Sequence, residues 1–227
     1  MILSRLRLDP HSRQVQRELA DPYQMHRTIL RAFPTPLPEL ERVLYRYDVT
    51  PHANEILLLV QSQTHPDWSF LHGQSYLQTA LFDSGDNPSV KTVSLNFTAG
   101  QYLYFRLRAN PTQSLPSERK AGEMRPRGQR VALYKEEDQR EWLVRKAAAS
   151  GFCLRSVNIK KQESAYTTIH RQEKTHEFRL SLVQFDGLLQ VTDPYVLLQA
   201  INRGIGHGKV FGCGMFSLAP GWISPSG

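Results

Sequence analysis

The chain opens with an alternation of apolar and polar side chains, which is the period of a β-strand with one buried face. In "ILSRLRL" (residues 2–8) the even positions are predicted to face the core. Two helical stretches follow, "HSRQVQRELA" (11–20) and "YQMHRTILRAF" (23–33). Asp21 is the expected N-cap of the second helix, because Pro22 fits the first helical position and its fixed φ favours a helix start.

Strand patterns continue through the first half of the chain. "RVLYRYDV" (42–49) and "NEILLLVQSQ" (54–63) predict a hairpin, and the alternation of "QYLYFRLRAN" (101–110) predicts a further strand. The order strand, helix, strand, strand, short helix, strand predicts an N-terminal domain over residues 1–110. Residues 111–130 lack an apolar period and are rich in Pro, Gly, Ser and Arg, so we expect a basic linker or loop there.

The second half repeats this order of elements. The next expected elements are a short strand at 130–134, a helix at 135–150 that Gly151 closes, and a strand at 152–161. "HEFRLSLVQFDGLLQV" (176–191) predicts a hairpin that turns at Asp186-Gly187, because Asp-Gly suits a two-residue turn. Asp193-Pro194 predicts the start of the helix "YVLLQAINR" (195–203), and "MFSLAP" (215–220) predicts the last strand.

The repeated order predicts an α+β fold of two tandem ferredoxin-like (RRM-like) domains. The first domain would cover residues 1–110 and carry the helix that begins at Pro22, and the second would cover residues 131–227. Sheets of this kind are a common platform for RNA binding. A fold does not determine a function, so the chemistry must be sought in particular residues.

The composition favours a polyanionic partner. Twenty-eight Lys and Arg against 21 Asp and Glu give a net charge of +7 over 227 residues and a sequence pI near 9.5, so nucleic acid is the first partner to consider. The longest aliphatic run, residues 56–60, is far shorter than the ~20 residues that cross a bilayer. The N-terminus lacks the apolar core of a signal peptide, so no membrane association and a cytoplasmic location are expected.

No metal or cofactor site is expected. The two cysteines, Cys153 and Cys213, form no CxxC pair, and the histidines show no HxxxH or HExxH spacing. The glycine-rich segment "GIGHGKVFGCG" (204–214) is not a Walker A loop, because Arg203 stands where its first glycine should be and Val210 follows the Gly-Lys pair. It is either a flexible turn or a bare backbone that packs closely on a partner.

The helix over residues 23–33 carries the strongest candidate for chemistry. His26 lies at the edge of its apolar stripe, and Tyr23 is three residues earlier on the same side. Arg27 and Arg31 continue around the helix, so a phosphate could bind where a proton could move. A lone histidine beside an apolar face is more often structural, and spacing alone leaves both interpretations open.

The strand "YLYFRLRAN" (102–110) offers a second candidate surface. It could present Arg106 and Arg108 to an RNA backbone, because aromatic and basic residues alternate along it. An ordinary solvated strand face would have the same pattern, so this interpretation also stays open.

Four ordered motifs together resemble the CasE family, the CRISPR RNA-processing endoribonucleases of the type I-E Cascade complex. They are "DPYQMHRTILRAF", "YFRLRANP", "LVQFDGLLQVTDP" and "GIGHGKVFGCGMFSLAP". The resemblance implies two ferredoxin-like domains and metal-independent cleavage of the CRISPR repeat RNA beside its stem-loop, without a small-molecule cofactor. It also implies that the protein keeps its product bound and has other Cascade subunits as partners.

The resemblance also implies roles for particular residues. His26 matches the catalytic histidine of the family and Tyr23 its assisting tyrosine, while Lys209 matches a loop lysine. The glycine-rich loop would line the groove between the domains; its glycines are Gly204, Gly206, Gly208, Gly212 and Gly214. Basic residues flank a region that forms an RNA-contacting hairpin in the family; they are Arg155, Lys160, Lys161, Arg171 and Lys174.

Two other functions remain open at this point. A non-catalytic RNA-binding subunit would use the same basic groove while His26 only packs. A nucleotide-binding enzyme would use the glycine-rich loop, although the failed Walker spacing disfavours it. In the catalytic interpretation the 2′-OH of the RNA attacks the adjacent phosphate, and His26 acts as base or acid. The products would then carry a 2′,3′-cyclic phosphate and a 5′-OH.

Overall fold

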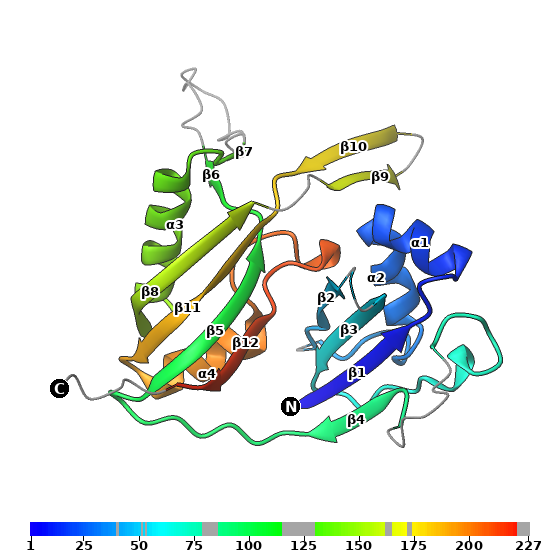
Figure 1. Ribbon diagram of the computed structural model, residues 1–227, viewed down its shortest axis with the longest axis horizontal. Coiled ribbons are helices and arrows are strands. Elements are labelled where there is room, and N and C mark those ends of the chain that lie inside the picture. Colours follow the sequence, from blue (N-terminus) through cyan, green and yellow to red (C-terminus); the bar gives the residue numbers. More distant parts are fainter. Residues whose placement is uncertain are drawn as a thin grey trace.

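The computed structural model contains two four-stranded antiparallel sheets that lie side by side, with helices packed against each (Figure 1). It describes residues 1–39, 41–50, 52, 54–78, 86–114, 130–161, 165–171 and 174–221, with the side chains of 165–171 and 174–179 excepted. The part of the chain so described holds four α-helices, and none of them is long and apolar enough to cross a membrane.

The first sheet has the strand order β2-β3-β1-β4. Its elements are β1 (Ile2–Leu8), α1 (Arg13–Ala20), α2 (Pro22–Leu30), β2 (Leu44–Thr50), β3 (Glu55–Ser62), a 3₁₀ turn η2 (Ser69–Leu71) and β4 (Ser89–Thr92). The even positions of β1 are buried, which confirms the alternation predicted from the sequence. The predicted β2-β3 hairpin and both helices are confirmed as well.

The second sheet has the strand order β12-β5-β11-β8. When the four strands are counted in chain order within each half, both sheets have the order 4-1-3-2. Its elements are β5 (Tyr102–Ala109), α3 (Glu136–Ala148), β8 (Phe152–Lys161), β11 (Val183–Val191), α4 (Pro194–Arg203), a 3₁₀ turn η3 (Lys209–Phe211) and β12 (Phe216–Pro220). The core between this sheet and its helices includes Trp142, Phe152, Phe185 and Phe216. Gly151 closes α3 with φ +76°, and the Asp193 side chain caps α4, both as predicted.

Two small hairpins extend from the second sheet. β6 (Thr112–Ser114) pairs with β7 (Arg130–Ala132), and residues 115–129 between them lie outside the described residues. β9 (Ala165–Arg171) pairs with β10 (Lys174–Leu180). The β9-β10 hairpin reaches across to the first half of the molecule, where β9 contacts α2 (Figure 1).

The domain boundary predicted at residue 110 is wrong. β5 pairs with β11 and β12, so it belongs to the second sheet. The connection between the sheets is therefore the segment 93–101. In the sequence, the predicted linker 111–130 falls between β5 and α3, which both belong to the second half, and its residues 115–129 lie outside the described residues. Alternating side chains identify a strand but not its partner, which is why the sequence pattern misplaced β5.

The turn predicted at Asp186-Gly187 is also wrong, because both residues lie inside β11. A Cβ on Gly187 would lie 2.1 Å from the carbonyl oxygen of Ser156 on β8, so the glycine allows two strands to approach closely. Asp186 accepts a hydrogen bond from Arg106 on β5 at 2.7 Å. In this strand, Gly187 thus allows the close contact with β8, and Asp186 forms the ion pair with Arg106.

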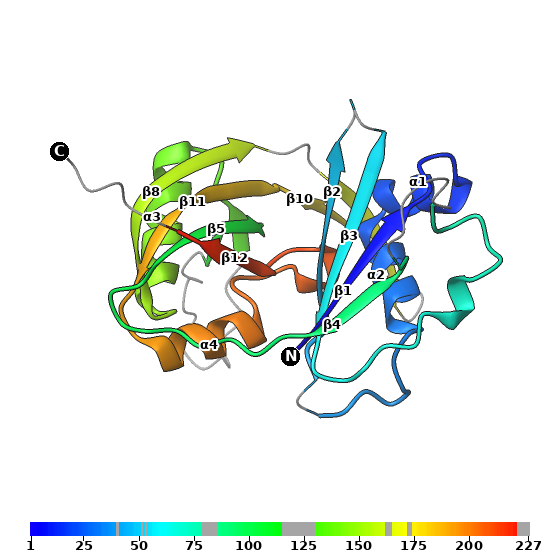
Figure 2. The same ribbon diagram turned by 60° about the horizontal axis from the view of Figure 1, so that its bottom comes forward.

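Polar side chains and one loop join the two halves of the molecule. Arg46 on β2 donates to Ser217 on β12 at 2.7 Å, and Gln61 on β3 donates to the carbonyl of Ile201 on α4 at 2.9 Å. The segment between α4 and β12 runs between the two sheets (orange to red in Figure 2). This segment contains the glycine-rich loop, so the loop lies at the junction of the two halves.

Candidate active site

The first turn of α2 fixes the two candidate catalytic side chains. Asp21 accepts a hydrogen bond from the Tyr23 backbone N–H at 3.1 Å, and Pro22 occupies the first helical position. Met25 and Ile29 are fully buried and anchor the helix on the first sheet. This leaves His26 and Tyr23 half-buried on the flank of α2, beside η3 of the glycine-rich loop.

His26 lies in a mainly apolar environment. Its ring stacks on Tyr45 with centroids 6.1 Å apart and an angle of 15°, and the Tyr23 ring lies at 6.5 Å. Its Nδ1 atom is buried and has no hydrogen-bond partner among the described residues. Burial lowers the pKa of His26 from 6.5 to about 4, because the charged imidazolium loses its hydration. The imidazole is therefore neutral near pH 7 and can accept a proton.

Tyr23 connects α2 with the glycine-rich loop. Its ring lies 6.4 Å from the Phe211 ring at an angle of 51°. It packs against a small buried cluster whose members are Leu180, Leu182, Phe211 and Cys213. Three segments that are distant in sequence thus meet beside His26: α2, the end of β10 and the glycine-rich loop.

The glycine-rich loop has a bare backbone because it packs closely on both halves of the molecule. All five of its glycines have positive φ, between +73° and +87°. A Cβ on Gly204 would lie 2.9 Å from Leu44, and one on Gly212 would lie 3.0 Å from Tyr45, both on β2. On the other side, a Cβ on Gly206 would lie 3.0 Å from Trp142 on α3. Larger residues would therefore push the loop away from β2 and α3.

Lys209 is folded back onto this loop. Its Nζ donates to the carbonyl of Gly206 at 3.2 Å, and the side chain is partly buried. Burial lowers the pKa of Lys209, and the nearby charges of Arg42 and Lys146 lower it further. Arg42, Lys146 and Lys209 thus concentrate positive charge here, which favours an anion in this place.

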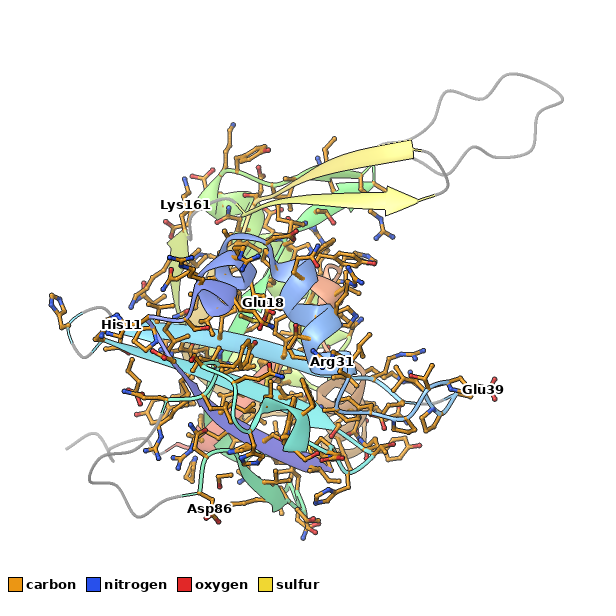
Figure 3. All side chains as sticks on the ribbon, turned by 90° about the vertical axis from the view of Figure 1, so that its right-hand side faces the viewer. His11, Glu18, Arg31, Glu39, Asp86 and Lys161 are labelled. Atoms are coloured by element: carbon orange, nitrogen blue, oxygen red, sulfur yellow. The ribbon has the colours of Figure 1, made fainter. Side chains whose placement is uncertain are left out.

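Arg27 on α2 and Arg31, the C-cap of this helix, are both exposed. Arg27 donates to Gln24 at 3.3 Å. Arg31, which follows the last turn of α2, holds its guanidinium 4.4 Å above the Phe70 ring (Figure 3). Both keep most of their guanidinium N–H groups accessible to a phosphate.

The strand β5 does not present two free arginines. Arg108 is only 7% exposed, lies 4.3 Å above the Tyr47 ring and donates to the Tyr47 hydroxyl at 3.1 Å. The expectation that Arg108 faces an RNA backbone is therefore wrong: it is a buried contact between the two halves. Arg106 is 42% exposed and paired with Asp186 at 2.7 Å, so its guanidinium is only partly accessible.

The remaining basic candidates lie along β8. Arg155 is exposed and hydrogen-bonds to Gln190, and Lys161 is exposed at the end of β8, just before the β9-β10 hairpin (Figure 3). Lys160 and Arg106 line an open hollow of about 600 Å³ on the second sheet, and His26 does not line this hollow. Arg171 and Lys174 are paired across β9 and β10, but their side chains lie outside the described set.

The described residues offer no metal centre, since they contain no group of three His, Cys, Asp or Glu side chains placed to hold an ion. Burial raises the pKa of Cys213 to about 12, so this thiol stays protonated. Sequence reasoning missed Tyr45, which touches both His26 and the loop. Its alternation in β2 resembles that of any core residue, so no signal in the sequence distinguished it.

Comparisons with known proteins identify the relatives of this chain. A family model described as CRISPR associated protein matches residues 1–220. The CRISPR-associated endoribonuclease Cse3 of Thermus thermophilus is 34% identical over 229 residues, which cover 97% of this chain and 100% of Cse3. The CRISPR system Cascade subunit CasE of Escherichia coli is 28% identical over 202 residues, which cover 88% of this chain and 92% of CasE.

A solved structure is similar over the same length. The structure of the CRISPR endoribonuclease Cse3 bound to a 19-nucleotide RNA has a TM-score of 0.77 and 34% identity, and the match covers 97% of this chain and 100% of that one. The mixed α and β architecture with antiparallel sheets is thus shared with Cse3. The resemblance seen in the sequence motifs is confirmed, and the chain belongs to the CRISPR associated protein family.

Proposed function

We propose that this protein is an endoribonuclease that cleaves CRISPR repeat RNA beside its stem-loop and then stays bound to the product as a Cascade subunit. The observation that carries the proposal is the position of His26 and Tyr23, at the junction of α2 and the glycine-rich loop. The chain also aligns with the endoribonuclease Cse3 along 97% of its length.

In the proposed reaction the RNA supplies its own nucleophile. The 2′-oxygen attacks the adjacent phosphorus, and the bond from phosphorus to the 5′-oxygen breaks. The products are a 2′,3′-cyclic phosphate and a 5′-OH, and the proton of the 2′-OH is balanced by the one that the leaving oxygen receives. No metal ion is required, because a neutral His26 can accept the first proton or, once protonated, donate the second.

The neighbouring residues would bind and orient the phosphate. Tyr23, three residues before His26 on α2, would donate its hydroxyl to a phosphate held at the flank of this helix. Arg27 and Arg31 on the same helix and Lys209 on the loop supply positive charge around it. A cation near the scissile phosphate, Lys160, Lys161 or an arginine, would stabilise the additional negative charge of the pentacoordinate state.

The rest of the RNA would extend over the second half of the molecule. Arg155 and the half-exposed Arg106 carry further positive charge on that sheet, and the β9-β10 hairpin lies beside α2. We assign the two halves to tandem ferredoxin-like domains, residues 1–92 and 102–221. The shared strand orders β2-β3-β1-β4 and β12-β5-β11-β8 support this assignment.

A non-catalytic RNA-binding subunit is the alternative, and the burial of the His26 ring favours it. Replacing His26 by Ala separates the two functions, because it removes the imidazole while the buried anchors Met25 and Ile29 remain. We expect single-turnover cleavage of the host's repeat RNA to slow by roughly 10² to 10⁴-fold, with hairpin affinity nearly unchanged.

His11→Ala is the matched control, because His11 is exposed in the turn just before α1 (Figure 3). It should cleave at the wild-type rate. Cleavage by His26→Ala at the wild-type rate would contradict the assignment of His26. Equal loss of binding and cleavage in a poorly folded variant would instead support a structural role for this residue.

A further inference from the structure

We propose that Tyr45 is a positioning residue that holds His26 and the glycine-rich loop in register for cleavage. The inference rests on the function proposed above and adds a residue to its site. Tyr45 does not reach the surface, since its side chain is 0% exposed. It acts through the groups that it contacts: the His26 ring, the first turn of α2 and the backbone of the loop.

The Tyr45 ring forms the wall on which His26 rests. The two rings are nearly parallel, at 15°, with centroids 6.1 Å apart. Among the described residues, no partner hydrogen-bonds to Nδ1 of His26 and so fixes the orientation of its ring. In many enzymes such a bond selects the position and tautomer of a catalytic histidine. Here the stacked ring of Tyr45 is a contact that restricts the imidazole.

The Tyr45 hydroxyl ties the catalytic helix to the loop. It donates to the carbonyl of Pro22 at 2.6 Å and lies 3.2 Å from the carbonyl of Val210. Pro22 is four residues before His26, so its carbonyl is the one that pairs with the His26 backbone N–H in an α-helix. Val210 belongs to η3, the centre of the glycine-rich loop. One buried hydroxyl thus sets the distance between the backbone below His26 and the loop.

The loop encloses the same ring from another side. A Cβ on Gly212 would lie 3.0 Å from Cε2 of Tyr45 and 3.4 Å from its Cζ. Gly212 also has φ +74°, which disfavours other residues. The Tyr45 ring therefore lies between His26 and the Gly212 backbone. A shift of the loop at Gly212 would move this ring and, with it, the imidazole of His26.

Tyr45→Phe tests this role with the smallest possible change. The variant keeps the ring that stacks on His26 and removes only the hydroxyl. We expect single-turnover cleavage of the repeat RNA to slow by roughly 10-fold, because a small misplacement of reacting groups lowers the rate strongly. The affinity for the hairpin should stay within about 2-fold, since phosphate contacts elsewhere on the surface provide it. The pH profile of cleavage should keep its midpoints, because the His26 ring stays buried.

Tyr76→Phe is the matched control. Tyr76 is another fully buried tyrosine in the same core, and its hydroxyl donates to Glu18 on α1 at 2.6 Å rather than to the α2 backbone or the loop. It should lower the stability at least as much as Tyr45→Phe but leave the cleavage rate unchanged. If Tyr45→Phe and Tyr76→Phe slowed cleavage equally, general destabilisation would explain the slower rate and the proposal would be overturned.

Gly212→Ala reaches the same ring from the loop. The added methyl group pushes on Tyr45, so slower cleavage with intact RNA binding is expected again. Wild-type rates in both Tyr45→Phe and Gly212→Ala would contradict the proposal. If His26→Ala is inactive while these two variants cleave normally, only the role of Tyr45 fails. If His26→Ala itself cleaves normally, the proposed function fails.

Discussion

His26 differs from a surface histidine because the protein keeps it neutral. Burial against Tyr45 and Tyr23 lowers its pKa to about 4, so near pH 7 almost every imidazole is unprotonated before RNA arrives. A phosphate placed beside the ring would raise this pKa again, because a negative charge stabilises the imidazolium. RNA binding would thereby prepare the residue to hold a proton during the reaction.

The low pKa can be measured directly in the free protein. An NMR titration should give a midpoint near 4 for His26, and a midpoint near 6.5 would contradict the burial of its ring. The same shift makes stability depend on pH. Since the folded pKa lies below 6.5, the unfolded chain binds the proton more readily between pH 6.5 and 4. Stability relative to His26→Gln should be constant above pH 6.5 and fall as the pH drops toward 4.

Two helices in this chain begin in the same way and serve different purposes. Asp21 caps α2, which carries His26, and Asp193 caps α4, which leads to the glycine-rich loop only at its far end. Asp193 accepts from the backbone N–H groups of Tyr195 and Val196, both at 3.0 Å. Both caps therefore use an aspartate side chain. Asp21 lies within two turns of His26, whereas Asp193 lies at the end of α4 that is remote from the glycine-rich loop.

This difference gives a matched pair of variants. Asp21→Ala and Asp193→Ala should each lower the free energy of unfolding by about 1 kcal/mol, the usual cost of losing an N-cap. Only Asp21→Ala should also slow cleavage, because fraying of the first turn of α2 displaces Tyr23. Chemical denaturation and single-turnover cleavage measure the two effects. Equal rates in both variants would show that the start of α2 does not position the site.

The elements that sequence could predict are those with local signals. Asp21-Pro22 and Asp193-Pro194 marked two helix starts correctly, because a cap acts within a few residues. The turn predicted at Asp186-Gly187 was wrong because the contact that requires this glycine is not local. A glycine is needed at Gly187 because a Cβ there would lie 2.1 Å from the carbonyl oxygen of Ser156. Ser156 lies on a strand that is distant in sequence, so no local pattern could indicate this contact.

The two halves of the molecule meet through contacts that no pattern along the chain reveals. Arg46 is 4% exposed and reaches Ser217, and Arg108 stacks on Tyr47. The basic and aromatic alternation of β5 suggested a surface for RNA, but the same alternation points Arg108 toward the other half. His26 and Tyr23 could be found from sequence because one helical turn brings them together. Tyr45 could not, because its contact with the loop exists only after both halves have packed.

Attack by the RNA's own 2′-OH is the step in which His26 would transfer a proton, and an RNA without this hydroxyl tests the step directly. Purified protein is incubated in EDTA with the host's repeat RNA, and with the same RNA carrying a 2′-deoxy sugar just upstream of the scissile phosphate. We expect cleavage of the first RNA with a 2′,3′-cyclic phosphate and a 5′-OH at the new ends, and binding without cleavage of the second. Cutting of the deoxy RNA at the same bond, or loss of cleavage in EDTA, would contradict this mechanism.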